Sequence, residues 1–520
     1  MSQVRKRCSG LVIALTFLLL ISGVLAALPN AKVEGQPGTL TLTTPNPVSN
    51  GEFGYSVALS NDTVVVGAPY ETVSGMSGAG EVYLFNSATG ALVQTLTDPN
   101  PQIQGHFGIS VSISGNTVVA GASDVSVSGN SDDGQAYVFD AATGSLIATL
   151  NSPYPAYEGD FGRSVAVSGS SVIIGAFGES AAGDYYAGRA YLFGAVSGNL
   201  AQSLASPSPQ TTGLFGRSVA ISGDAVVVGA PGQNASGVHQ AGQVYIFDAT
   251  TGGLTQTFSS PNPVANGFDA YIGNFGFSVA ASGNTVAVGA PYDNEGGYTQ
   301  GGAVYVFDAT TGALTQTITS PNPSTEEYFG TSIAISGNTV AVGANDLSAS
   351  GNAEAGLVYI FNASTGALVQ TLSSPNAQFE GSFGISVAVS GNTVAVGAAG
   401  EAEGTIDGAG NAYVTSISST PTTSATTASI ATSVSATSPV VTTSIVSSTT
   451  ISSSSESSSL TVISSTSTSS GIPEFPFQIG LLTLATLVVL TAYALTRRSA
   501  KINAQMVARV TPSRPTLGFD

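Results

Sequence analysis

The chain has few residues that could carry out catalysis. It contains two histidines, His106 and His239, which are far apart in sequence, and a single cysteine, Cys8. It has no HExxH, GxSxG or phosphate-binding-loop motif, so no sequence signature marks a hydrolase or a nucleotide-binding enzyme. Paired carboxylates could hydrolyse a glycosidic bond, but the chain has no tryptophan to support a sugar. We therefore expect a protein that is not an enzyme, and a glycosidase is the weaker alternative.

Tyrosine side chains offer a different chemistry, which is non-covalent recognition. A tyrosine presents a flat apolar ring and a polar hydroxyl, and this combination suits sugar and protein ligands. Several tyrosines lie among Gly, Asn, Ser and acidic residues, in stretches whose length and composition vary along the chain. The candidate ligand-binding residues are Tyr70, Tyr157, Tyr185, Tyr186, Tyr292, Tyr298 and Tyr328. The alternative for any one of them is a solvated loop residue that binds nothing.

Charged residues are scarce and mostly acidic. They make up 8% of the chain, against about 25% in ordinary soluble domains, and the formal net charge is −19. A nonspecific nucleic-acid binder needs a basic face to neutralise phosphates, so we exclude nucleic acid as a partner. Most of the basic residues lie near the two ends of the chain, where they flank apolar runs.

These ends predict an exported protein that is anchored in a membrane. Arg5–Arg7 precede a short apolar run, which is typical of a signal peptide over residues 1–26, and a retained N-terminal anchor is the alternative. The apolar run Phe477–Thr496 is long enough to span a bilayer, and basic residues after it would place a tail, residues 497–520, in the cytoplasm. Residues 418–470 are too rich in Ser and Thr to fold, so we expect a stalk there. The protein would thus sit at the cell surface with its N-terminal domain outside.

The segment between the signal peptide and the stalk is a sevenfold repeat. The dipeptide Phe-Gly recurs at intervals of 54, 54, 54, 60, 54 and 54 residues. Its phenylalanines are Phe53, Phe107, Phe161, Phe215, Phe275, Phe329 and Phe383. Each repeat holds four short apolar runs bounded by Gly, Asn and Ser, a pattern that predicts β-strands. We name these strands A to D; in the repeat that begins at Phe329 they are SIAIS, TVAVGA, LVYIF and ALVQTL.

Four-stranded units at this spacing predict an all-β fold, a seven-bladed β-propeller over residues 38–417. The last repeat ends on strand C, at Tyr413–Ser416, while Thr39–Pro47 resembles the D-strand ends of the other repeats. We therefore expect the N-terminal strand to close the ring, with strand A innermost and strand D outermost. A solenoid is the alternative, but it leaves the displaced strand unexplained. In a propeller the A–B and C–D turns share one face, and the variable B–C and D–A loops share the other.

The repeats resemble FG-GAP repeats, the blades of the propeller of integrin α-subunits. Phe-Gly occurs in all seven, and Gly-Ala-Pro is intact at Gly67, Gly229 and Gly289. The resemblance implies extracellular recognition and, often, Ca²⁺ held in loops with the pattern DxDxDG. No loop here has that spacing; the nearest candidates for Ca²⁺ ligands are Asp132 with Asp133 and Asp293 with Glu295, and solvated acidic loops are the alternative. We expect no other cofactor.

Two further motifs bear on processing. Pro473-Glu474-Phe475-Pro476, just before the apolar span, looks like the PEF-type sorting signal of archaeal surface proteins, so residues 473–496 would combine this motif with the transmembrane helix. The resemblance implies a sorting transpeptidase as a partner; a retained anchor is the simpler interpretation. The candidate N-glycosylation sites are Asn61, Asn234 and Asn362.

Together these features predict a surface-anchored binding or adhesion protein that recognises protein or glycan ligands without catalysis. The variable B–C and D–A loops are the expected site, because binding residues concentrate on loops held by a rigid scaffold. A structural component of the cell envelope is the alternative function, since the stalk and the acidic surface would suit it equally.

Overall fold

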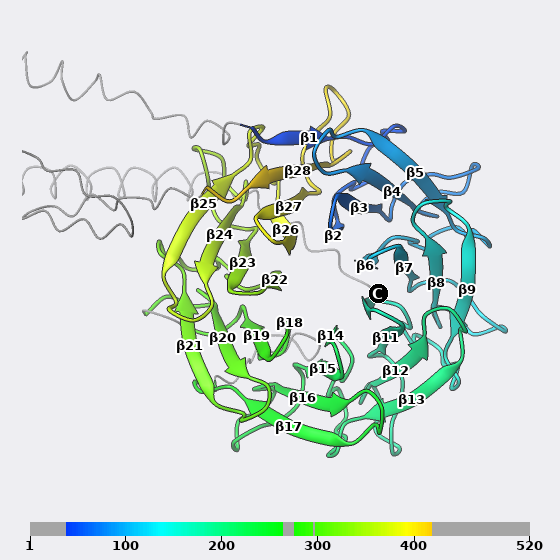
Figure 1. Cartoon of the computed structure of the whole chain (residues 1–520), viewed down its shortest axis with the longest axis vertical. Helices are drawn as coiled ribbons and strands as arrows, with labels where there is room; N and C mark the ends of the chain where they lie inside the picture. The colour runs from blue at the N-terminus through cyan, green and yellow to red at the C-terminus, as the bar shows by residue number, and fades with distance from the viewer. Residues whose placement is uncertain (1–37, 264–274, 295–296, 419–520) are drawn as a thin grey trace, which may run out of the picture. The chain divides into compact units, whose positions relative to one another are not determined.

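The computed structural model describes residues 38–263, 275–294 and 297–418, which form β-strands and the connections between them. The strands make seven four-stranded antiparallel sheets arranged around a central axis (Figure 1). The predicted signal peptide, the stalk from residue 419 onward, the PEF motif, the apolar span and the tail lie outside the described residues. Within the described ranges no helix is long and apolar enough to cross a membrane.

Each sheet is one blade, in which strands A to D follow one another from the axis outward. The strands of blades 1 to 6 are, in this order, β2 (Ser56–Ser60), β3 (Thr63–Ala68), β4 (Glu81–Asn86) and β5 (Leu92–Thr97); β6 (Ser110–Ser114), β7 (Thr117–Ala122), β8 (Gln135–Asp140) and β9 (Leu146–Asn151); β10 (Ser164–Ser168), β11 (Ser171–Ala176), β12 (Arg189–Gly194) and β13 (Leu200–Ala205); β14 (Ser218–Ser222), β15 (Ala225–Ala230), β16 (Gln243–Asp248) and β17 (Leu254–Ser259); β18 (Ser278–Ser282), β19 (Thr285–Ala290), β20 (Ala303–Asp308) and β21 (Leu314–Thr319); β22 (Ile333–Ser336), β23 (Thr339–Ala344), β24 (Leu357–Asn362) and β25 (Leu368–Ser373).

Blade 7 is assembled from both ends of the domain. Its inner strands are β26 (Phe383–Ser390), β27 (Thr393–Ala398) and β28 (Asn411–Ser416), and its outer strand is β1 (Leu40–Leu42) from the N-terminus. Leu40 pairs with Val414 and Leu42 with Ala412 in an antiparallel register. The predicted closure of the ring by the N-terminal strand is therefore confirmed, and so is the seven-bladed propeller.

A ring of side-chain hydrogen bonds joins each blade to the next along the axis. In every blade the serine three residues after the Phe of Phe-Gly donates its hydroxyl to the carbonyl oxygen of the next Phe-Gly glycine, at 2.7 or 2.8 Å. The A strands of neighbouring blades also contact one another all the way round, from β2 to β26 and back. Strand A is thus the innermost strand, as its small apolar residues predict.

The glycines of Phe-Gly and Gly-Ala are required by a close contact between blades. Gly162, in Phe-Gly, has φ +92°, which L side chains rarely adopt. A Cβ atom on Gly121, in the Gly-Ala of the preceding blade, would lie 1.9 Å from the carbonyl oxygen of Gly162. Neither position can hold a side chain without moving the backbone, so these two glycines set the spacing of the blades.

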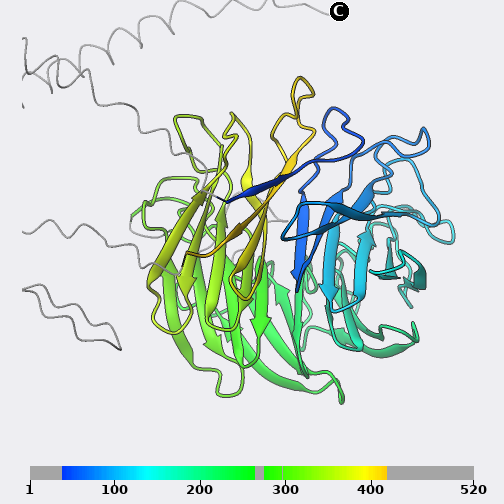
Figure 2. The same cartoon turned by 45° about the horizontal axis from the view of Figure 1, so that its top comes forward.

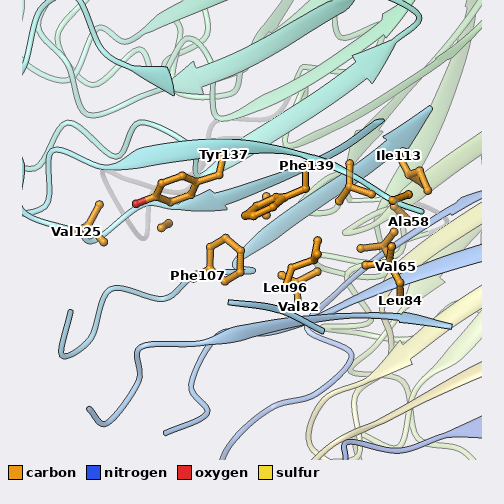
Figure 3. Packing of buried hydrophobic residues seen from close by; sticks show 14 residues of the cluster. Ala58, Val65, Val82, Leu84, Leu96, Phe107, Ile113, Val125, Tyr137 and Phe139 are labelled. Carbon is orange, nitrogen blue, oxygen red and sulfur yellow. The ribbon is translucent and has the colours of Figure 1, made fainter. Parts of the chain in front are cut away.

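The hydrophobic core lies between blades, and Figure 3 shows the part of it between blades 1 and 2. Phe107 is fully buried there, between Val82 and Leu96 of blade 1 and Phe139 of blade 2. Its ring lies 6.0 Å from that of Phe139 and meets it at an angle of 71°. The phenylalanine of Phe-Gly thus packs between blades, and this packing holds the loops before strand A against the preceding blade.

Candidate ligand-binding face

The B–C and D–A loops project from the same ends of the strands and are joined by backbone hydrogen bonds (Figure 2). The D–A loop that enters blade 2 pairs with the B–C loop of blade 1, through His106 N to Gly78 O and Phe107 N to Ala79 O, both at 3.0 Å. Asp160 and Phe161 make the same pair of bonds to the B–C loop of blade 2. These loops therefore form a continuous surface, which we call the loop face, on a rigid scaffold.

Three of the predicted tyrosines are exposed on the loop face. Tyr157, in the D–A loop before blade 3, is 62% exposed, Tyr185 in the B–C loop of blade 3 is 52% exposed, and Tyr298 is 40% exposed. Tyr157 lies within electrostatic reach of Tyr185, so blade 3 carries two exposed rings from different loops close together. Tyr154, exposed to 55%, adds a third ring and stacks on Arg189, whose guanidinium carbon lies 4.6 Å from the ring centroid.

Tyr186 packs against one of these exposed tyrosines, Tyr185. Its ring is only 8% exposed and lies 4.3 Å from the ring of Tyr185, and its hydroxyl donates to the carboxylate of Glu158. Burial, followed by the bond to Glu158, raises the pKa of Tyr186. Tyr186 is therefore placed to hold the exposed Tyr185 rather than to meet a ligand with its own ring.

The other three predicted tyrosines, Tyr70, Tyr292 and Tyr328, are half-buried. They lie where the loop face meets the axis of the propeller, next to the starts of the A strands, and we call this region the axial end of the ring. The ring of Tyr70 lies 4.6 Å from that of His106 and 5.9 Å from that of Tyr55. Tyr292 lies 5.3 Å from Tyr328. Burial raises the pKa of Tyr70 to about 12, so its hydroxyl remains protonated and able to donate a hydrogen bond.

Two arginines at the same axial end were not predicted as site residues. Arg163 and Arg217 follow directly after Phe-Gly in blades 3 and 4, where other blades have tyrosine, phenylalanine, threonine or isoleucine. This position immediately precedes strand A, next to the axis, so an alignment of the seven repeats could have revealed it. The signal is weak because only two of the seven repeats carry a charge there, and it lies outside the longer variable loops.

Several acidic loop residues serve the fold instead of the surface. Glu71 and Glu401 are fully buried and Glu179 is 1% exposed. Glu71 accepts hydrogen bonds of 2.5 Å from Thr44, which follows strand D of blade 7, and from Tyr83 on strand C of blade 1. The same set recurs as Ser152, Glu179 and Tyr191, and as Ser374, Glu401 and Tyr413. Each set fastens one blade to the next, and we call it the hydroxyl–acid–tyrosine latch.

In two other blades the tyrosine of the latch has a different polar partner. In blade 2 the loop position holds Val125, and the buried carboxyl comes instead from Asp98, which occupies the position of Thr44 and lies beside Tyr137. In blade 4 an amide replaces the acid, since Gln233 accepts from Tyr245 and donates to Ser206 at 2.8 Å. A buried tyrosine hydroxyl therefore faces an oxygen acceptor in each of these blades, as the cost of burying an unpaired polar group requires.

The predicted Ca²⁺ ligands lie in different settings. Asp293 is fully buried and accepts a 2.7 Å hydrogen bond from Tyr305, so it is the acid of the latch in blade 5. Asp133 is 1% exposed and accepts from the backbone nitrogen of Ala156 at 2.9 Å, while its neighbour Asp132 is half-buried. Glu295 lies outside the described residues. Among the described residues no group of three or more His, Cys, Asp or Glu is placed to hold a metal ion.

The opposite face consists of short turns that use their polar residues internally. Asp308 accepts hydrogen bonds from the backbone nitrogen of Thr311 at 2.7 Å and from its hydroxyl at 2.8 Å, and Asp248 does the same with Thr251. Asn362 holds the matching turn in blade 6, and Asn61 occupies an A–B turn at φ 51°. Two of the three sequons thus lie in these turns, whereas Asn234 is exposed in a B–C loop.

The fold and its repeated motif define the class of protein, a seven-bladed β-propeller with a variable loop face. A comparison with protein families matches the FG-GAP repeat over six ranges of the chain, residues 39–85, 91–139, 202–247, 273–307, 313–361 and 367–415. These ranges cover more than half of the 520 residues, so the chain belongs to the FG-GAP repeat family. A search of curated proteins found no match.

Proposed function

We propose that the propeller is a non-catalytic recognition module of a surface-anchored protein and binds protein or glycan ligands with its loop face. The observation that carries this proposal is the group of exposed rings on blade 3, Tyr154, Tyr157 and Tyr185, each more than half exposed. Exposed aromatic rings cost solvation free energy unless a partner covers them, and tyrosine is enriched in binding surfaces.

Two further observations support a binding role for this face. The rings stand on loops that are joined by backbone hydrogen bonds, which lowers the entropy lost when a ligand binds. The opposite face uses its polar side chains to hold its own turns, as at Asp308. The resemblance of the repeats to integrin α-subunit blades points in the same direction, toward extracellular recognition or adhesion.

The test is a pair of exposed-ring substitutions with a control on the opposite face. Tyr157→Ala with Tyr185→Ala should abolish adhesion to partner cells, or binding on glycan and protein arrays, and should change the melting temperature little. Val196→Ser is the matched control, because Val196 is 75% exposed in a C–D turn of the same blade. Loss of adhesion with the control alone would move the site to the opposite face, and adhesion indifferent to both would favour a structural envelope role.

The surface location has its own test. We propose that a signal peptide exports the propeller and that the C-terminal apolar run anchors it through the Ser/Thr stalk, with the PEF motif as a point of processing. Protease added to intact cells should then cut within residues 419–470 and release the propeller. A propeller that stays protected until the cells are lysed would contradict this topology.

A further inference from the structure

Two arginines lie beside the axis of the propeller on the loop face. The described residues contain three arginines and no lysine, and two of the three, Arg163 and Arg217, lie at the axial end of the ring. Each immediately precedes an innermost strand, β10 or β14, at matching positions of adjacent blades, and both are half-buried. The whole chain has a formal net charge of −19, so two arginines at matching positions of adjacent blades are unusual in this acidic protein.

Each of the two guanidinium groups is held by its own aromatic neighbours. Nη2 of Arg163 lies 3.3 Å from the hydroxyl of Tyr55, which belongs to blade 1, two blades away. The guanidinium of Arg217 lies 4.7 Å from the ring centroid of Phe277 and 5.7 Å from that of Phe177. Aromatic rings on both sides thus fix Arg217 in place through cation–π contacts.

Neither guanidinium has a carboxylate within ion-pair distance among the described residues. In the described part of the chain the ion pairs within 4.0 Å join only His106 to Asp124 and Arg189 to Glu179. Burial, and then repulsion by Arg163, lowers the pKa of Arg217 to about 10, so it is still charged at neutral pH. Burial raises the pKa of the nearby Asp160 to about 7, so it is partly protonated at neutral pH, whereas the pKa of Asp124, which also acts on Arg163, is lowered despite burial by its hydrogen bond with His106 and Asp124 stays charged.

The site suits a small anionic group that is recognised by side chains. A guanidinium fork matches a carboxylate with two parallel hydrogen bonds. The half-buried ring of Tyr70, 5.9 Å from that of Tyr55, is of the kind that sugars pack on. An extended peptide would instead need free backbone groups for strand addition. The loop backbone here is already paired, as at His106 N to Gly78 O.

We propose that Arg163 and Arg217 form an axial binding site for the carboxylate of an acidic sugar, such as a uronate residue of a surface glycan. This inference rests on the proposed recognition function and names its ligand class. No covalent step is involved, and the ligand would be held by charge-assisted hydrogen bonds from the two guanidinium groups.

The experiment measures binding of tri-galacturonate to the full-length protein by calorimetry. Arg163→Gln and Arg217→Gln should each raise the Kd about 10- to 100-fold, the effect of losing a charge-assisted hydrogen bond. Val196→Ser, at an exposed residue on the opposite face, is the control and should leave the Kd unchanged. Arg163→Lys serves if Arg163→Gln does not fold, and it should also weaken binding, because lysine keeps the charge but lacks the fork.

The outcomes separate this inference from the proposed function. Equal affinity for the methyl ester of tri-galacturonate, or an unchanged Kd in the Arg163→Gln, Arg217→Gln double variant, would overturn the carboxylate site. Arginine-dependent binding of a poly-glutamate peptide in place of the sugar would overturn the glycan assignment. If Tyr157→Ala with Tyr185→Ala abolishes adhesion while the arginine variants retain it, the loop-face function stands and the axial site falls.

Discussion

The hydroxyl of Ser386 donates a 2.8 Å hydrogen bond to the carbonyl oxygen of Gly54, 332 residues earlier in the chain. The same bond links the blades at each of the six remaining junctions, as from Ser56 to Gly108 at 2.7 Å. The junction between the two ends of the domain is therefore built like the six junctions inside it. Ring closure at this junction also depends on β1, which completes blade 7.

We predict that β1 contributes to stability as much as an internal outer strand does. Leu42 of β1 and Leu96 of β5 occupy matching positions and are both 1% exposed. Leu42→Ala should therefore lower the free energy of unfolding by about 2–5 kcal/mol, and Leu96→Ala by a similar amount. Denaturant unfolding measures both, with Leu92→Ala, 43% exposed, as a control that should change little.

Removal of the whole segment is the stronger form of the same test. Deletion of residues 28–47 should destabilise the entire domain, because it removes the outer strand of blade 7 and exposes an unpaired strand edge. A deletion variant that melts like the full chain would refute the role of β1 in closure.

The contact between Gly121 and Gly162 predicts a strong effect of a single methyl group. Gly121→Ala would place Cβ 1.9 Å from the carbonyl oxygen of Gly162 and should cost about 3 kcal/mol or more, since two blades must separate to relieve it. Thermal unfolding against wild type measures the loss.

Gly115 provides the control for this substitution. It has φ +57°, and no atom lies within 4 Å of the point where its Cβ would stand, so Gly115→Ala should cost only about 1 kcal/mol of backbone strain. Gly115→Asn should cost less, because Asn61 adopts φ 51° at the matching position of blade 1. Equal losses at Gly121 and Gly115 would show that the blades do not meet at these glycines.

The latch acids predict that stability falls as the pH rises. Burial raises the pKa of Glu71 and of Glu179 to about 7, from an ordinary value of 4.5. Between pH 4.5 and 7 the folded state therefore binds more protons than the unfolded chain, and the free energy of unfolding decreases with increasing pH. The contribution is complete below pH 4.5 and is lost as the pH passes 7, on the order of 3 kcal/mol for each carboxyl.

Denaturant unfolding at pH 5 and pH 8 measures this effect. Glu71→Gln and Glu179→Gln should reduce the pH dependence while preserving the latch, because Gln233 fills the same position in blade 4. Glu354→Gln, at an exposed residue, removes one acid without touching a latch and should leave the pH dependence as it is. Stability that increases from pH 5 to pH 8 would contradict the assignment.

The repeat pattern predicted the ring, the order of the strands and the displaced outer strand, because each depends on spacing that recurs seven times. The role of individual loop residues was harder to predict. The burial of Glu71 and Glu179 depends on a hydroxyl from the preceding blade, 27 residues earlier, and nothing in their own loops indicates it. Arg163 and Tyr55 are 108 residues apart and meet only because the ring curves back on itself. Such contacts follow from the way the blades pack around the axis and have no local signal.

Substitution of Asp293 tests whether this residue is a structural acid or a calcium ligand. Because it is buried and accepts a hydrogen bond from Tyr305, Asp293→Ala should lower the free energy of unfolding by about 1–3 kcal/mol, whether or not a chelator is present. Asp293→Asn keeps an oxygen acceptor and should cost less. Asp132, half-buried in the other candidate loop, is the comparison: if Ca²⁺ binds there, chelation lowers the melting temperature of wild type, and Asp132→Ala removes that response. A loss in Asp293→Ala that disappears once a chelator is added would instead make Asp293 a metal ligand.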